Sequence, residues 1–200
     1  MTATPHLPGP IAARPLRADA RRNREKVLEA ARAEFAAEGQ GAQMPDIARR
    51  AGVGVGTVYR HFPTKEALVE ALAADHFSRL ADDAERAVAH QGDDPWEDFM
   101  TLVERCGSRC ADDRGLAAAI SGSREILADA AEQETRLRAA TTILLERARD
   151  AGQVRADATV NDVAMIMCSL AYIADMENEG RGDFTWRRYM QVAFDGMRAR

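Results

Sequence analysis

Cysteine, aromatic residues and long apolar runs are all scarce in this 200-residue chain. The three cysteines are an odd number, which suits a reducing cytoplasm and gives no disulfide framework. The longest apolar run, 163–174, is well short of the roughly 20 residues that span a bilayer. The first residues also lack the charged start and apolar core of a signal peptide. We therefore expect a cytoplasmic protein with no membrane partner.

Signals for catalysis and for metal binding are missing as well. The four histidines have no metal-ligand spacing, no serine stands in a nucleophile elbow, and no pair of carboxylates stands out. Cys106 and Cys110 are four residues apart and could be two packed thiols, or else a redox or metal pair, although no further ligand lies close in sequence. The sequence predicts no enzyme, no cofactor and no metal site.

Positive charge is in deficit overall but is concentrated near the N-terminus. The formal net charge is −5, yet residues 1–62 carry ten lysines and arginines against six acidic residues, a net charge of +4. This asymmetry indicates that the N-terminal part meets a polyanion. Residues 1–18 contain four prolines and two arginines. We expect them to be a disordered basic tail, either simply solvated or acting as an arm on DNA.

The alternation of apolar and polar residues that is typical of β-strands is absent, whereas apolar residues recur with helical periodicity through most of the chain. The predicted fold class is all-α, with a three-helix N-terminal domain over 19–63 and a C-terminal helical domain over 64–200 that begins with a linking helix, 64–90. The expected helices are 19–37, a two-turn helix that opens at 43–46 and stops at Gly52, a second short helix between Gly54 and Pro63, and then 64–90, 96–110, 115–121, 123–151, 159–179 and 185–198.

The stretch AGVGVGTVYRHF, residues 51–62, has glycine at three alternate positions. It matches neither the G-x-G-x-x-G pattern of a dinucleotide site nor the Gly-Lys-Ser/Thr of a phosphate loop. A helix-turn-helix explains it better, because Gly52 can adopt a positive φ and Gly56 allows close approach to DNA. The residues expected to pack the two helices together are Ile47, Ala51, Val53 and Val58. Those expected to face DNA are Val55, Gly56, Thr57, Tyr59, Arg60 and His61.

The string ARAEFAAEG, followed by PDIARRAGVGVGTVYRHFPTKEALVEAL, resembles the N-terminal domain of TetR-family transcriptional regulators over roughly residues 21–77. The resemblance implies a homodimeric repressor that binds an inverted-repeat operator in double-stranded DNA and is released by a small-molecule effector held in the C-terminal domain. It adds Lys65 as a phosphate contact, and Gln43 could still reach a phosphate where many members have Thr or Ser. Gly54 replaces the common Ser, so we expect the recognition helix to lack a side-chain cap.

The C-terminal helices carry the two remaining sets of predicted residues. Because 163–174 is apolar nearly all round, the last two helices are expected to form the dimer interface, with a buried helix of a monomer as the alternative. The predicted interface residues are Met165, Leu170, Trp186, Tyr189, Met190 and Phe194. An effector pocket is implied by the resemblance, and the same apolar residues could otherwise be plain core: Trp96, Phe99, Met100, Val103, Ile120, Ile126, Leu127, Leu137, Thr141 and Met167. A regulator whose C-terminal domain only dimerises or recruits a partner, without an effector, remains the alternative.

Overall fold

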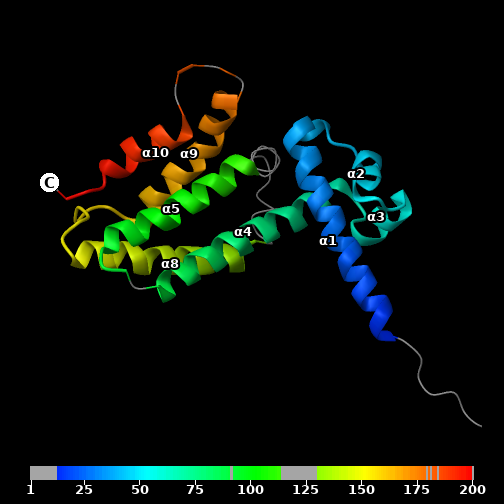
Figure 1. The fold of residues 1–200 in the computed structure, drawn as a ribbon, viewed down its shortest axis with the longest axis horizontal. Helices are drawn as coiled ribbons and strands as arrows, with labels where there is room; N and C mark the ends of the chain where they lie inside the picture. The colour runs from blue at the N-terminus through cyan, green and yellow to red at the C-terminus, as the bar shows by residue number, and fades with distance from the viewer. Residues whose placement is uncertain are drawn as a thin grey trace, which may run out of the picture.

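The computed structural model describes residues 13–90, 92–113, 130–178, 180, 182–183 and 185–199. Within these residues the chain is helical, and the single strand-like feature is an isolated bridge between Val154 and Arg198. The predicted all-α class is therefore confirmed. Figure 1 shows an N-terminal domain at one end and a helical bundle at the other, with α4 running from one into the other. The expected helix 115–121 lies outside the described residues.

The N-terminal domain consists of α1 (Ala13–Glu38), α2 (Met44–Ala51) and α3 (Val55–His61), with a short 3₁₀ turn, η1 (Gly39–Gly41), after α1. Apolar side chains from all three helices form its core, among them Val27, Phe35, Ile47 and Val58. The start of α1 was predicted at residue 19 and is wrong, since the helix already begins at Ala13. Pro15 falls in its first turn, where a missing N–H breaks no helical hydrogen bond, so the proline does not stop the helix.

Helix α4 (Lys65–Ala89) belongs to both domains. Its start is capped as expected, because the Thr64 hydroxyl accepts a hydrogen bond from the Ala67 N–H at 3.1 Å. Leu68 and Leu72, in its first half, are buried in the N-terminal core, whereas Leu80, in its second half, is buried in the C-terminal core. The expected domain boundary at residue 63 therefore cuts through the N-terminal core, which continues into α4.

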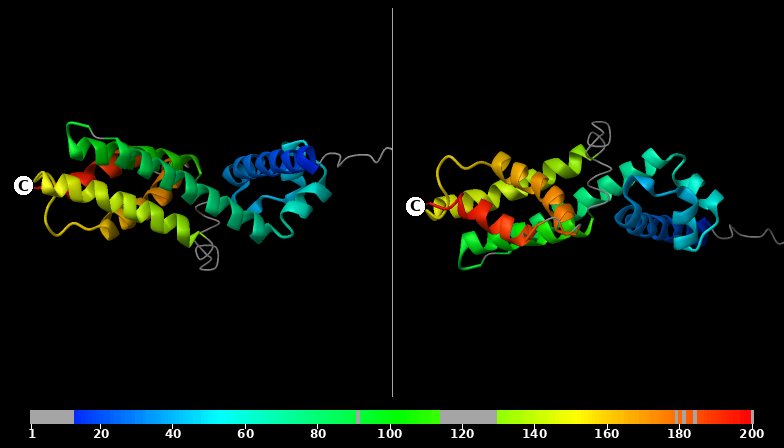
Figure 2. Two further views of the ribbon diagram at one scale, coloured as in Figure 1. Left: turned by 90° about the horizontal axis from the view of Figure 1, so that it is seen from below. Right: turned by 90° about the horizontal axis from the view of Figure 1, so that it is seen from above.

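The C-terminal bundle adds α5 (Pro95–Asp112), α8 (Ala131–Asp150), α9 (Val160–Asn178) and α10 (Trp186–Asp195) to the second half of α4. Helix α5 lies in the middle, with α4 and α8 on one side and α9 and α10 on the other (Figures 1 and 2). Gly107 lets α10 pack closely on α5, because a Cβ at this position would lie 2.8 Å from the Met190 sulfur. The expected start of α8 near residue 123 is wrong: Ala130 is a turn residue, and 123–129 lie outside the described residues.

One acidic side chain, Asp83 of α4, is buried in this bundle with only 2% of its side chain exposed. Arg86 and Arg109 donate hydrogen bonds to its carboxylate, and Arg105 lies 3.7 Å away. Burial alone would raise the pKa of Asp83, but the hydrogen bonds and charges of the two arginines hold it below its ordinary value of 3.8. Asp83 thus ties α4 to α5 as a charged, fully paired group.

We expect Asp83→Asn to lower the free energy of unfolding by about 2 kcal/mol, because the arginines lose their partner at a buried position. The folded-state pKa of Asp83 is below its unfolded value, so its contribution is complete above pH ~3.8 and is lost as pH falls through the folded pKa. Denaturant unfolding of the wild type and the variant at neutral and acidic pH measures both effects. The difference between the two proteins should shrink in acid.

The matched control is Asp82→Asn, one residue earlier on α4. Asp82 is about half exposed and pairs with Arg136 at 2.9 Å, so its loss should cost only about 0–1 kcal/mol. An equal cost for both substitutions would contradict a special role for the buried carboxylate.

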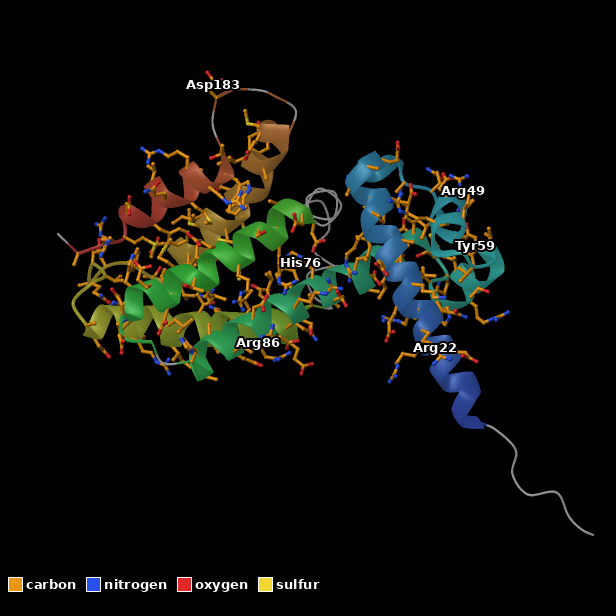
Figure 3. The ribbon with its side chains drawn as sticks, viewed as in Figure 1. Arg22, Arg49, Tyr59, His76, Arg86 and Asp183 are labelled. Carbon is orange, nitrogen blue, oxygen red and sulfur yellow. The ribbon has the colours of Figure 1, made fainter. Side chains whose placement is uncertain are left out.

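A second set of charges joins the two domains at the middle of α4. Arg32 of α1 and Arg79 both pair with Asp75, the latter at 2.8 Å. One residue further on is His76, which is labelled in Figure 3. Its Nδ1 lies 2.8 Å from the carboxylate of Asp113, which follows the last residue of α5. Burial would raise the pKa of Asp113, but the hydrogen bond to His76 and the nearby arginine charges hold it below its usual value. The N-terminal domain is therefore connected to Asp75 of α4, and the end of α5 is connected to the adjacent residue, His76.

Candidate nucleic-acid interface

The turn between α2 and α3 is set by backbone conformations that few residue types adopt. Pro45 and Asp46 stand in the first turn of α2, where a proline is tolerated and a negative charge is favourable. At the other end, Gly52 has φ +67°, and the following Val53 N–H reaches back to the Ala48 carbonyl at 3.1 Å. The predicted role of Gly52 is confirmed: it ends α2 and turns the chain towards α3.

The recognition-type helix α3 is held at both ends and through its inner side. It begins after Gly54, whose carbonyl accepts from the Thr57 N–H at 2.8 Å, and it has no side-chain cap, as the glycine predicts. Val58 is fully buried against α1 and α2, and the chain leaves α3 at Phe62, which is also buried. With this side fixed, the opposite side of a helix of only seven residues must face solvent.

That outer face presents most of the residues predicted to meet DNA. Val55 and Tyr59 are 40% and 47% exposed, and Gly56 and Arg60 are exposed beside them. Their spacing places all four on one side of α3. Thr57 and His61 are half-buried along its edge. Tyr59 lies at the end of the molecule away from the C-terminal bundle (Figure 3).

Two other predicted DNA contacts lie off α3 and already have partners. The Gln43 amide is exposed before α2 and donates to the Gly41 carbonyl at 2.9 Å, so it does not cap the helix. Lys65 is half-buried at the start of α4, donates to the Gln40 carbonyl and lies 5.5 Å from the centre of the Phe35 ring. A phosphate contact by Lys65 therefore requires it to exchange this carbonyl for the phosphate.

Basic residues on α2 belong to the same end of the molecule and were missed by the sequence analysis. Arg49 and Arg50 are exposed in the last turn of α2, and Figure 3 shows Arg49 at the same end of the molecule as Tyr59. Arg49 pairs with Asp46 at 2.8 Å, and Arg50 pairs with Glu34 at 3.1 Å. Two adjacent arginines immediately before the turn were the available signal. The Arg49–Asp46 pair is exposed and exchanges readily for phosphate, because such a pair is worth about 0–1 kcal/mol.

The residues predicted for the dimer interface divide into two groups. Leu170, Trp186, Met190 and Phe194 are buried in the C-terminal core of the same chain, and their contact with a second copy stays a prediction. Each packs towards α5 rather than outward. Tyr189 is half-buried, and Met165 is exposed. The inward stripe of α9 and the outward stripe are both apolar, which is why the sequence pattern did not separate them.

The predicted effector residues lie in or against the same core. Trp96, Phe99, Val103 and Thr141 are buried, and the Thr141 hydroxyl donates to the carbonyl of Leu137, one turn earlier. Met100, Leu137 and Met167 are partly buried against them, and Ile120, Ile126 and Leu127 lie outside the described residues. An open groove of about 780 Å³ between α5 and α10 is lined in part by Trp96 and Met100.

The cysteines of α5 are packed thiols rather than reactive ones. Burial raises the pKa of both Cys106 and Cys110 to about 12, so both are protonated at neutral pH. Among the described residues, no three His, Cys, Asp or Glu side chains converge as metal ligands would. Within the same part of the chain, no helix has the length and apolar character needed to cross a membrane.

Two short helices joined by a glycine turn, the second with its inner side packed and its outer side exposed, define a helix-turn-helix DNA-binding protein. Comparison with known families specifies the class. The profile described as "Bacterial regulatory proteins, tetR family" matches residues 27–72, and that of the "Transcriptional regulator SbtR-like, C-terminal domain" matches residues 94–199. The chain belongs to the TetR family of transcriptional regulators.

Solved structures and a curated relative agree with this assignment. A TetR regulator from Mycobacterium vanbaalenii is 40% identical, with a TM-score of 0.66 over 92% of this chain and 100% of that one. The TetR regulator SCO0520 from Streptomyces coelicolor is 30% identical, with a TM-score of 0.64 over 88% of this chain and 98% of that one. The HTH-type transcriptional repressor KstR of Mycolicibacterium smegmatis is 36% identical over 90 residues, a match that spans 44% of each chain.

Proposed function

We propose that this regulator is a repressor that acts in the cytoplasm, binds an inverted-repeat operator as a homodimer and is released by a small-molecule effector. The observation that carries the proposal is the exposed outer face of α3, with Val55, Tyr59 and Arg60 turned away from a packed domain. A helix of this size fits the major groove of B-form DNA. The description of KstR as a repressor supports repression as the direction of control.

Each side chain of this face has a chemically suitable partner on DNA. Val55 and the methyl group of Thr57 can contact a thymine methyl, and Arg60 can bind a guanine edge or a phosphate. The Tyr59 hydroxyl and the His61 ring can donate to phosphate oxygens, which fix the register of the protein on the duplex. Gly56 adds no side chain and so allows close approach. Gln43 and Lys65 flank this face as further phosphate donors.

Dimerisation is supported by the outward side of α9. Met165 and Tyr172 are 69% and 64% exposed, and Cys168 and Ser169 are exposed between them on the same side of the helix. Val192 of α10 adds another exposed apolar side chain. A second copy that covers this face would place two α3 helices on one duplex, which an inverted repeat requires with half-sites about 34 Å apart.

Effector control is proposed to act through α4. The half-buried side chains Met100, Leu137 and Met167 remain the candidates for contact with an apolar molecule. Binding that favours one arrangement of the bundle would move α4, to which α1 is tied through Arg32 and Asp75. The protein is in equilibrium between a conformation that fits DNA and one that fits it badly. The effector can shift this equilibrium only by its difference in affinity for the two conformations.

We expect the purified protein to bind DNA taken from immediately upstream of its own coding sequence in a sequence-dependent and salt-dependent way. If each subunit makes three to five phosphate contacts, the logarithm of the affinity should fall with the logarithm of salt concentration with a slope of about −5 to −9 for the dimer. Fluorescence anisotropy titrations over a range of salt concentrations measure this slope, and saturation gives the number of chains bound.

A scrambled duplex of equal length and composition is the control. Preferential binding of two chains, or a multiple of two, to the upstream DNA supports the proposal. Equal affinity for both duplexes, or a flat salt response, contradicts sequence recognition by this surface at that site.

A further inference from the structure

The residues of α1 that contribute to the core of the N-terminal domain begin at Val27. None of the residues Asp19 to Lys26 is buried, and from Asp19 onward the first buried side chain is that of Val27. The fourteen residues 13–26 nevertheless continue the helix, which at 1.5 Å per residue extends it by about 21 Å. Figure 1 shows these turns reaching past α2 and α3. Packing within the chain therefore does not account for the helical turns formed by residues 19–26.

Four of the five arginines of this extension are spaced so that they fall on one side of the helix. Positions 14, 17, 21 and 24, all arginine, follow the spacing i, i+3, i+7 and i+10, which places them within one face of an α-helix. We call these four residues the arginine stripe. Residues 13–26 contain six arginines and lysines against two acidic residues, so the extension has a net charge of +4. This charge and periodicity suit a linear polyanion.

The stripe starts beside the recognition helix. The guanidinium of Arg24 lies 5.4 Å from the centre of the Phe62 ring, and Phe62 directly follows the last residue of α3. This contact orients the striped face towards the end of α3 that carries His61. Arg24, at one end of the stripe, therefore lies beside the residue that ends α3.

The acidic residues of the extension do not block this surface. Glu25 lies 3.7 Å from Arg21, and Asp19 pairs with Arg22, but in both pairs the side chains are more than half exposed. Such pairs contribute about 0–1 kcal/mol, so the arginines can exchange them for phosphate oxygens at little cost. Arginine binds phosphate through two parallel N–H donors, which makes the exchange favourable.

We infer that the arginine stripe binds the DNA phosphate backbone that flanks the groove entered by α3. This inference rests on the proposed function and extends its footprint beyond the helix-turn-helix. In each subunit of the dimer, the extension would follow the backbone outward from the half-site. It adds affinity and lengthens the duplex that the protein covers, without reading bases itself.

The test compares two double variants within the same helix. Arg17→Gln/Arg21→Gln removes two charges from the stripe, whereas Arg22→Gln/Lys26→Gln removes two charges from another face of the same turns. Glutamine and arginine have similar helix propensities, so the helix should persist in both. The probe is a duplex enriched by the wild-type protein from a randomised pool, with additional base pairs on both sides of the enriched repeat.

We expect the stripe variant to bind this duplex at least about tenfold more weakly and to reduce the magnitude of the salt slope by about 3 to 4, since two contacts are lost in each of two subunits. The control variant should change both quantities much less. Trimming the flanking base pairs should weaken binding of the wild type and the control, and should leave the stripe variant nearly unaffected.

The outcomes separate this inference from the proposed function. Equal losses in the two double variants, or no loss in the stripe variant, overturn the inference while sequence-specific binding by the wild type still supports a helix-turn-helix regulator. Failure of the wild type to enrich any sequence overturns both. A loss confined to the stripe variant, together with its insensitivity to trimming, supports the stripe as a backbone-binding surface.

Discussion

Tyr59→Ala is expected to weaken operator binding by about 30- to 700-fold without unfolding the protein. The substitution removes a ring and a hydroxyl from the exposed face of α3 in both subunits, and such a loss corresponds to about 2–4 kcal/mol for the dimer. The fold should be preserved because Tyr59 is about half exposed and the core of its domain is formed by the opposite side of α3. Titration of labelled operator measures the affinity, and circular dichroism with thermal unfolding measures the fold.

Two further variants separate the possible causes. Tyr59→Phe keeps the ring and removes only the hydroxyl, so a comparable loss would assign the effect to a phosphate hydrogen bond. Ile143→Ala removes a large side chain that is 44% exposed on α8, far from α3 in the chain, and should leave operator binding unchanged. Wild-type affinity in Tyr59→Ala would remove this side chain from the interface.

The double variant Met165→Arg/Tyr172→Arg is expected to convert a dimer into monomers. Both side chains are exposed on the outward side of α9, so arginine is accommodated in the isolated chain, but two subunits packed through this face would bury four added positive charges. Operator affinity should fall by at least about 100-fold, because a single half-site contributes only part of the binding energy. Sedimentation velocity gives the mass of the particle, and DNA titration gives the affinity.

The matched control again uses α8. Ile143→Arg introduces a charge at an exposed apolar position away from α9 and should leave the mass unchanged. A double variant on α9 that remains dimeric would place the subunit contact on another face. A monomeric variant with full operator affinity would contradict the requirement for two recognition helices on one site.

The helix-turn-helix was predictable from sequence because its determinants are local. The left-handed backbone conformation at the end of α2 favours glycine, which is Gly52. Thr64 caps α4 through its own hydroxyl. The missing side-chain cap of α3 follows from the absence of a side chain at Gly54. Each of these effects depends on residues within one turn of the position concerned. The same locality explains why the stop of α2 at Gly52 could be predicted from sequence.

The C-terminal residues were harder to assign because apolar periodicity does not reveal what covers an apolar face. On α9, Leu170 and Met165 are both apolar, yet the first is buried by α5 and the second is exposed. Which side of such a helix turns inward depends on how α5, α9 and α10 meet, and this contact lies between segments distant in sequence. An effector pocket depends on space left between the same helices, which no residue pattern specifies.

The sharing of α4 between two cores means that its length and phase fix the orientation of one domain relative to the other. Leu72 and Leu80 lie eight positions apart on one unbroken helix, yet each serves a different core. Because an α-helix has 3.6 residues per turn, a single residue inserted between them would rotate the DNA-binding domain by about 100° and shift it by about 1.5 Å. An insertion of two full turns, seven residues, would restore the phase to within about 20°. Exchange of C-terminal domains between relatives is therefore constrained to joints that keep the helical register of α4, even where both domains fold normally.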